Sequence, residues 1–148
     1  MLYNEINKTM LEAMKSKDKE TLSTIRLLKS AIDLYKINNK LTEITDDVVI
    51  EVASKQVKQH RESIEEFRNA GRNDLADNLE KEINIISKFL PEQLSKEEIE
   101  KEIDEIFAVV KPESKKDMGK IMKEANIRLK GKTDFKLVSE IVNTKLGI

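Results

Sequence analysis

The chain has 148 residues, of which 39% are hydrophobic and 37% are charged, and its formal net charge at pH 7 is −1. It contains 4 glycines, 2 prolines and no cysteine. This composition favours long helices and excludes disulfides, zinc–thiolate sites and thiol catalysis. The sequence has neither an apolar run of about 18 residues nor an apolar leader core, so we expect a cytoplasmic protein with no membrane partner.

Charged residues are unevenly distributed along the chain. Residues 1–73 hold 13 Lys/Arg and 12 Asp/Glu, residues 74–107 hold 4 and 11, and residues 111–148 hold 10 and 5. The net charges of these segments are therefore +1, −7 and +5. A basic C-terminal part indicates an anionic partner. The alternative is an ordinary solvated helix surface, and charge alone does not separate the two.

The first part of the chain predicts four helices. Apolar residues recur at spacings of three and four in four segments, at residues 2–15, 19–37, 46–70 and 74–90. Ser16 or Asp18 is the candidate cap of the second helix, and Thr45 is that of the third. Gly71 can adopt a positive φ without a Cβ penalty, so the third and fourth helices are expected to form an antiparallel hairpin.

The second of these helices has an unusually wide apolar stripe. Its centre is formed by Leu22, Ile25, Leu28, Ile32 and Tyr35. Leu27, Ala31 and Leu34 widen the stripe, so we expect this helix to be the most buried of the N-terminal set.

Pro91 and the residues after it predict a domain boundary. Proline excludes the preceding residue from the α region, so the fourth helix is expected to end there. Ser95 and Glu98 then form a capping-box pattern, which is a strong signal for a new helix. The whole chain is predicted to be all-α. It would comprise an N-terminal four-helix bundle-like domain with a long helical hairpin (residues 1–93) and a small C-terminal three-helix domain (residues 95–148).

Three helices are expected in the C-terminal domain. The first follows Ser95 and ends before Pro112. Ser114 is the candidate cap of the second, and Thr133 or Asp134 is that of the third.

Catalytic constellations are scarce in this sequence. Its one histidine, His60, lies on the apolar stripe of the third helix, where a packed or edge histidine is expected. The scattered glycines form no nucleotide-binding loop, and carboxylate pairs such as Glu65 and Glu66 lie on polar helix faces. No metal-ligand pattern occurs. We therefore expect no catalytic residue, no metal, no cofactor and no enzymatic activity of the chain itself.

Gly119 is the most unusual residue of the C-terminal domain. Inside a helix, glycine costs about 1 kcal/mol relative to alanine, so its position near the start of a helix needs a reason. Close approach of a ligand's backbone is one reason, and tight packing against another helix is a second, compatible one. Lys115, Lys116 and Lys120 lie nearby at the positive end of the helix dipole, where a phosphate would be stabilised.

A second basic cluster flanks the predicted turn at Gly131. It comprises Arg128, Lys130, Lys132 and Lys136. Aromatic residues for base stacking are missing there except Phe135, which the apolar stripe assigns to the core. RNA binding by this part of the chain should therefore read mainly backbone and shape.

Four segments carry a family resemblance. They are LPEQLSKEEI (Leu90–Ile99), HRESIEEFRNAGRNDLA (His60–Ala76), KKDMGKIM (Lys115–Met122) and GKTDFKLVSEIVNTKL (Gly131–Leu146). Together they resemble the stand-alone GatB/YqeY family over essentially the whole chain. The resemblance implies an N-terminal helical bundle followed by a small three-helix domain. A similar module forms the tail of the B subunit of the tRNA-dependent Asp/Glu amidotransferase, and a related one is attached to some glutaminyl-tRNA synthetases.

The resemblance also implies a function. In the amidotransferase the tail touches the outer corner of tRNA, while the catalytic parts lie elsewhere. By this resemblance, Lys116, Gly119, Lys120 and residues 131–134 fall on the tRNA-facing motifs. One departure is Phe135, which stands where the family often has glycine.

The implied function is a non-catalytic, tRNA-binding accessory module associated with tRNA-dependent amidation or aminoacylation. The family-level label of a carbon–nitrogen ligase with glutamine as amido-nitrogen donor would belong to the complete enzyme. The alternative is a protein–protein adaptor that binds a tRNA synthetase or an amidotransferase subunit. No DNA partner is expected.

Overall fold

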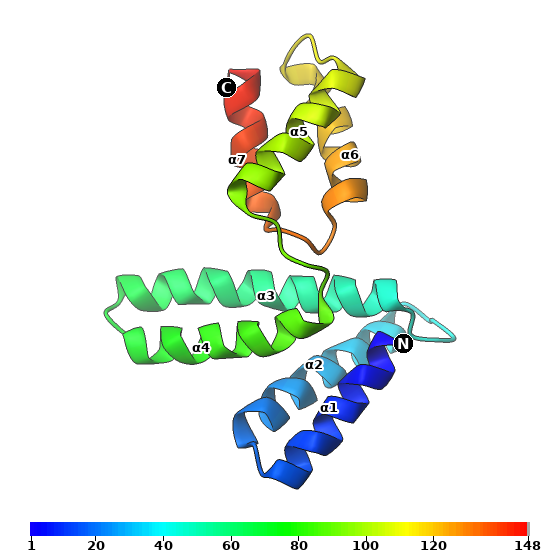
Figure 1. The fold of residues 1–148 in the computed structure, drawn as a ribbon, viewed down its shortest axis with the longest axis vertical. Coiled ribbons are helices and arrows are strands. Elements are labelled where there is room, and N and C mark those ends of the chain that lie inside the picture. Colours follow the sequence, from blue (N-terminus) through cyan, green and yellow to red (C-terminus); the bar gives the residue numbers. More distant parts are fainter. Residues whose placement is uncertain (148) are drawn as a thin grey trace. The chain divides into compact units, whose positions relative to one another are not determined.

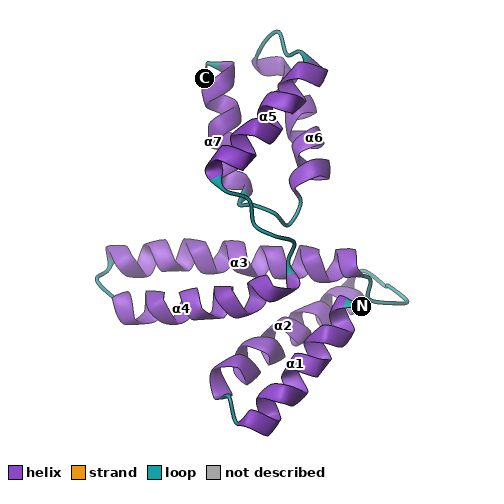
Figure 2. Cartoon of the chain, viewed as in Figure 1, coloured by secondary structure: helices purple, strands orange, loops and turns teal. Residues whose placement is uncertain are grey.

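The computed structural model describes residues 1–147, and within them the regular elements are seven α-helices and two short 3-10 turns, with no strand (Figures 1 and 2). The all-α prediction is confirmed. The chain divides into two compact units, an N-terminal unit at Met1–Pro91 and a C-terminal unit that begins at Glu92. Independent folding of residues 1–93 and 95–148 as domains stays a prediction. Among the helices of residues 1–147, none has both the length and the apolar character that a membrane crossing requires.

The N-terminal unit consists of two helical hairpins (Figure 1). The first pairs α1 (Leu2–Ser16) with α2 (Lys19–Asn38), and the second pairs α3 (Asp46–Asn69) with α4 (Asn73–Ile86). One apolar core joins the four helices and is formed by Ile6, Ile25, Leu28, Ile32, Val49, Val52, Ala53, Val57, Ile86 and Phe89.

Local sequence determines where these helices begin and end. The Asp18 carboxylate accepts a hydrogen bond from the backbone N–H of Thr21 (3.2 Å), and the Thr45 hydroxyl accepts one from Val48 (3.3 Å). Both residues therefore act as N-caps, and of the two candidates for α2 it is Asp18 that does so. Gly71 has a φ of 75° in the turn between α3 and α4, which is the conformation that favoured glycine there.

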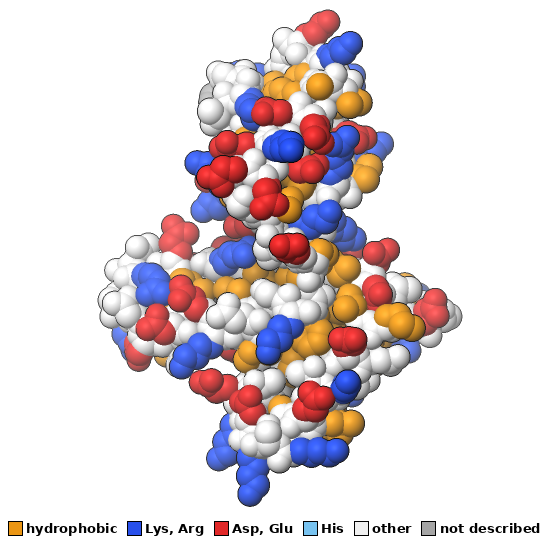
Figure 3. Space-filling view, in the orientation of Figure 1, with side chains coloured by type: hydrophobic (Ala, Val, Ile, Leu, Met, Phe, Trp, Pro, Cys, Tyr) orange, Lys and Arg blue, Asp and Glu red, His pale blue; other side chains and the backbone are white. Residues whose placement is uncertain are grey.

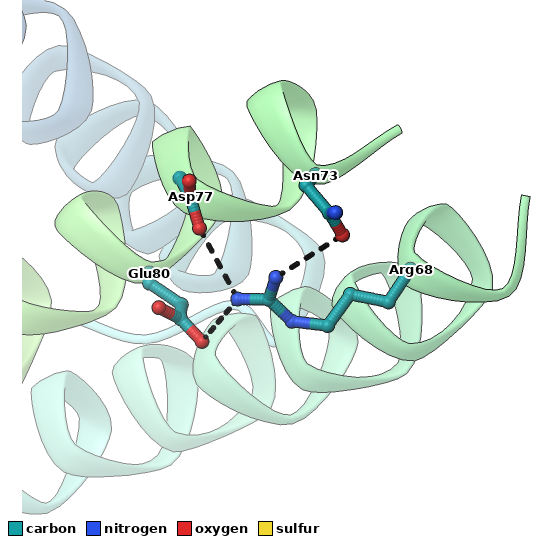
Figure 4. Close-up of polar contacts among 4 residues, drawn as sticks. All are labelled: Arg68, Asn73, Asp77 and Glu80. Carbon is teal, nitrogen blue, oxygen red and sulfur yellow. Dashed lines mark hydrogen bonds and ion pairs between the residues drawn. The ribbon is translucent and has the colours of Figure 1, made fainter. Parts of the chain in front are cut away.

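Arg68 connects α3 to α4 beside this turn (Figure 4). Its guanidinium group donates hydrogen bonds to Asn73 Oδ1 (3.4 Å), Asp77 Oδ1 (3.2 Å) and Glu80 Oε1 (2.8 Å). The hydrogen bonds to Glu80 and then Asp77 raise the pKa of Arg68. Because all four groups are on the surface, their main effect is to fix the register of the hairpin rather than to add much stability.

The predicted end of the fourth helix was wrong. α4 ends at Ile86 instead of Leu90 and is followed by a 3-10 turn, η1 (Ser87–Phe89). Leu90 is extended, with φ −102° and ψ 156°, as a residue before Pro91 should be. The tighter turn places the Phe89 ring in the core.

The predicted burial of Leu27 and Leu34 was also wrong. Their side chains are 60% and 56% exposed, and Ile37 in the same helix is 72% exposed. α2 contacts α1, α3 and α4 through the arc of the helix that contains Ile25 and Leu28, and this arc is fully buried. Because the three neighbouring helices cover only this arc, α2 leaves apolar side chains in solvent.

The C-terminal unit packs three helices, α5 (Lys96–Val110), α6 (Met118–Leu129) and α7 (Phe135–Leu146), with a 3-10 turn, η2 (Lys115–Asp117), before α6. Its core is formed by Ile99, Ile103, Ile106, Ile121, Ala125, Leu129, Val138, Ile141 and Val142.

Two helix starts in this unit agree with the sequence. Ser95 Oγ accepts a hydrogen bond from the N–H of Glu98 (3.2 Å), and Glu98 Oε1 accepts one from the N–H of Ser95 (3.4 Å), so the capping box is present. The Asp134 carboxylate caps α7 by accepting a hydrogen bond from the N–H of Lys136 (3.0 Å).

Candidate nucleic-acid interface

Gly119 is the second residue of α6 and faces solvent. A Cβ atom added to it would have no heavy atom within 4 Å outside the adjoining backbone. Tight helix packing within the C-terminal unit is therefore not the reason for this glycine. The other explanation, close approach of a ligand's backbone, stays a prediction.

The solvent side of α6 carries two lysines, Lys120 and Lys123. Successive residues of an α-helix are rotated by about 100°, which places Gly119, Lys123 and Asn126 within an arc of about 60°. Lys120 and Ile127 flank this arc on one side, and all five residues are exposed. The exposed charged residues of α6 are two lysines, Lys120 and Lys123, and the half-buried Glu124 directly follows Lys123. We call these five residues the lysine face.

Lys123 was missed by the sequence analysis. It lies three residues after Lys120 and four after Gly119, and this helical spacing was the signal that could have identified it. Within residues 1–147, no ion pair involves Lys115, Lys116 or Lys123. Lys120 is 3.7 Å from Asp117 and keeps 76% of its side chain exposed. These ammonium groups are therefore accessible to an anion.

The predicted start of α6 at Ser114 was wrong. Ser114 Oγ accepts a hydrogen bond from the N–H of Lys116 (3.3 Å) and so caps η2, while α6 begins at Met118. The Asp117 carboxylate lies at this helix start and accepts a hydrogen bond from the N–H of Glu113 (2.9 Å). That backbone N–H lowers the pKa of Asp117. A carboxylate thus lies where a phosphate was expected, and anion binding by the lysine side chains stays a prediction.

The second basic cluster lies at the other end of α6. Gly131 is buried with a φ of 76°, and its carbonyl accepts a hydrogen bond from Gln93 Nε2 (2.6 Å). The carbonyl of Lys132 accepts one from the N–H of Leu94 (2.9 Å). Gly131 therefore allows the chain to turn after α6, and its carbonyl helps to hold this turn against the segment before α5. It offers no surface to RNA.

The two predicted clusters do not form one compact patch. Lys115, Lys116 and Lys120 lie at the start of α6, whereas Lys130 and Lys136 are exposed at the turn after it. At about 1.5 Å per residue, the length of α6 separates the two groups by roughly 15 Å. Figure 1 shows η2 and the α6–α7 turn at opposite ends of this helix. The lysine face begins at the first group and extends along α6 toward the second.

Arg128 points away from the lysine face. Its Nη1 atom lies 3.2 Å from Glu105 and 3.6 Å from Glu102, both on α5. Lys145 of α7 forms an ion pair with Asp104 of α5. Acidic and basic side chains are accordingly interleaved on the face of the C-terminal unit that Figure 3 displays. An RNA contact by Arg128 stays a prediction and has to compete with these ion pairs.

Other polar groups show no catalytic arrangement in the described residues. His60 is an edge residue as predicted, with its Nε2 atom 3.7 Å from Glu82 and its side chain 22% exposed. Within residues 1–147 no group of three or more His, Cys, Asp or Glu side chains is placed to hold a metal ion.

Comparison with known proteins identifies the family. The family model described as Yqey-like protein matches residues 3–146. The chain belongs to the Yqey-like family. The match covers α1 to α7 and therefore includes the lysine face.

Similar proteins occur in fungi. An uncharacterized protein of Schizosaccharomyces pombe is 38% identical over 90 residues, which cover 61% of this chain and 72% of that protein. Altered inheritance of mitochondria protein 41, mitochondrial, of Pyrenophora tritici-repentis is 31% identical over 140 residues, covering 91% and 75%. The protein of the same name from Kluyveromyces lactis is 29% identical over 137 residues, covering 88% and 68%. The last two relatives are named as mitochondrial.

Proposed function

We propose that this Yqey-like protein binds tRNA through the lysine face and acts as a non-catalytic accessory to tRNA-dependent amidation or aminoacylation. The observation that carries the proposal is that both exposed charged residues of α6, Lys120 and Lys123, are lysines and lie near a glycine with open space in front of it. The resemblance to the tail of the amidotransferase B subunit supports the choice of tRNA and of its outer corner. A cytoplasmic location belongs to the same proposal.

The chemistry of the lysine face suits a phosphate backbone. Lysine is a compact point charge on a flexible chain, so Lys120 and Lys123 can follow phosphates without a fixed geometry. Gly119 adds no side chain next to them, which lets a ribose–phosphate backbone approach the helix. Lys115 and Lys116 extend the positive charge beyond the start of α6. Since the lysine face has no aromatic side chain, it would read backbone and shape rather than stacked bases.

Ion pairs inside the C-terminal unit reduce the electrostatic repulsion between the acidic helix α5 and RNA. Glu102 and Glu105 face Arg128, and Asp104 faces Lys145. These ion pairs neutralise part of the negative charge of α5 on a side of the unit other than the lysine face. The local potential at the lysine face is therefore more positive than the net charge of the whole chain suggests.

A double substitution tests the proposal. Each phosphate contact contributes about 0.7 to 0.9 log units of affinity at about 0.1 M salt, so Lys120→Gln/Lys123→Gln should weaken tRNA binding about 25- to 60-fold. Fluorescence anisotropy with labelled tRNA measures this change. The matched control is Lys55→Gln/Lys58→Gln, which removes two exposed lysines from α3. Equal losses in the two variants, or no tRNA binding by the unmodified protein, would overturn the proposal.

A protein partner is the second candidate, because Ile127 is 69% exposed at the C-terminal end of the lysine face. An apolar anchor beside lysines suits an acidic surface of a tRNA synthetase or an amidotransferase subunit. For this function, tRNA should give no mobility shift, and Ile127→Ser should abolish binding of the protein partner. For the tRNA function, the same substitution should leave tRNA affinity within about twofold, because it removes no charge.

A further inference from the structure

The exposed side of α2 carries an uncharged strip with coiled-coil spacing. It consists of Ser23, Leu27, Ser30, Leu34 and Ile37, which are separated by four, three, four and three residues. All five are exposed, and the three apolar side chains are 60%, 56% and 72% exposed. This 4-3 alternation is the spacing with which one helix packs along another. In a chain with 37% charged residues, a strip of this length without a charge indicates a contact surface.

We propose that a second copy of this chain packs on the α2 strip, with the two α2 helices antiparallel about a two-fold axis. The alternation of large and small residues supports a self-complementary contact. With the axis between Leu28 and Lys29, Leu27 faces the partner's Ser30 and Leu34 faces the partner's Ser23. Each leucine then meets a small side chain, so the two helices can interdigitate at a short interaxial distance. This inference concerns the N-terminal unit and is independent of the proposed tRNA binding.

Charges beside the strip fit the same register. Arg26 and Asp33 each directly precede a leucine of the strip and therefore flank it on the same side. In the antiparallel register Arg26 lies opposite the partner's Asp33, and the two-fold axis forms this pair twice. Within residues 1–147 Arg26 is exposed and has no ion pair. Oδ1 of Asp33 accepts a hydrogen bond from the Tyr3 hydroxyl (2.7 Å), which leaves Oδ2 for the partner.

A parallel arrangement fits less well. It would place Leu27 against the partner's Leu27 and Ser30 against the partner's Ser30, which alternates crowded and empty layers. Arg26 would then face the partner's Ala31 and form no ion pair. A shallow groove of about 320 Å³ between α2 and α3 adjoins the strip at Ala31 and Leu34 and gives a second helix room there. Because one helix pair is a small interface, we expect a dissociation constant in the micromolar range.

Sedimentation velocity over a range of concentrations tests the apolar part of the contact. The unmodified protein should change from monomer to dimer as its concentration rises, and Leu27→Ser/Leu34→Ser should weaken the dimer at least tenfold. Leu11→Ser/Val109→Ser is the matched control, since it removes two other apolar side chains that are 54% and 70% exposed. A monomer at every concentration, or an equal effect of the control, would overturn the proposal.

Charge exchange tests the specific register. Arg26→Glu and Asp33→Lys should each weaken self-association, because each puts like charges opposite each other. An equal mixture of the two variants should form heterodimers again, because the two opposite-charge pairs are then restored. Tyr3→Phe controls for the lost hydrogen bond to Asp33 without changing a charge. Failure of the mixture to associate more tightly than either variant would exclude this register.

Cysteine cross-linking tests the orientation, since the chain has no cysteine of its own. Ser23→Cys mixed with Leu34→Cys should give a disulfide-linked dimer on mild oxidation. Ser23→Cys alone should not, because in the antiparallel register its two copies are eleven residues apart along the axis, or about 16 Å. A cross-link of Ser23→Cys with itself but not with Leu34→Cys would show a parallel pair and overturn the proposal.

Discussion

Replacing Gly119 by alanine should change stability and RNA binding in opposite directions. The new methyl group would meet no heavy atom within 4 Å outside the adjoining backbone, so the folded unit accommodates it without strain. Alanine in place of a solvent-facing helical glycine stabilises a protein by about 0.4 to 1 kcal/mol. In a unit of this size, that gain corresponds to a rise in the melting temperature of about 2 to 8 °C. Thermal unfolding followed by circular dichroism measures it.

The same methyl group should weaken tRNA binding, because it projects from the lysine face into the space proposed for the RNA backbone. A loss equivalent to one phosphate contact is about 5- to 8-fold at about 0.1 M salt. Gly71→Ala is the matched control. It also meets open space, but the φ of 75° at this position makes alanine unfavourable, by about 1 to 2 kcal/mol.

The control should therefore lower the stability of the protein and leave its tRNA affinity unchanged. A lower melting temperature for Gly119→Ala would show that the glycine is needed for packing. Unchanged tRNA affinity of Gly119→Ala would show that no backbone approaches α6 at this position. Either result would refute the reasoning.

Three further predictions concern other contacts of the structure. Arg128→Gln should reduce tRNA affinity less than Lys123→Gln, which should cost about 5- to 8-fold in anisotropy titrations, because ion pairs with α5 already engage Arg128. Ser95→Ala removes the capping box and should cost about 1 kcal/mol, seen as faster amide hydrogen exchange in α5. Burial, followed by the hydrogen bond to Asp33, raises the pKa of Tyr3 from 10.0 to about 12. The contribution of the neutral Tyr3 side chain to stability should therefore be complete below pH 10.0 and lost as the pH rises through about 12. The difference in phenolate absorbance between the unmodified protein and Tyr3→Phe should show that midpoint.

Local patterns in the sequence were sufficient to place most helices. Caps such as Asp18, Thr45 and Ser95 act within three or four residues of themselves, so the groups that they bind are visible in the sequence. The helical spacing of apolar residues likewise identified the buried arcs. The same spacing could not show how wide an arc the neighbouring helices cover, and this is why Leu27 and Leu34 were assigned to the core.

The candidate site was less predictable for a similar reason. Arg128 and Glu105 are 23 residues apart, and nothing local indicates that they meet. Lysines were grouped by their nearness to Gly119 and Gly131 and not by helical face, so Lys123 was missed and the buried Gly131 was included. The start of α6 was misplaced because a 3-10 turn and an α-helix share the same capping signal.

The salt dependence of tRNA binding tests the central claim most directly. Four lysines, Lys115, Lys116, Lys120 and Lys123, are available to phosphates at the start of α6 and in its first half. At about −0.7 to −0.9 per contact, the slope of log K against log salt should be about −2.8 to −3.6 between about 0.05 and 0.2 M. A slope near zero, or no measurable binding of tRNA at about 0.05 M salt, would contradict the claim that the lysine face holds a polyanion.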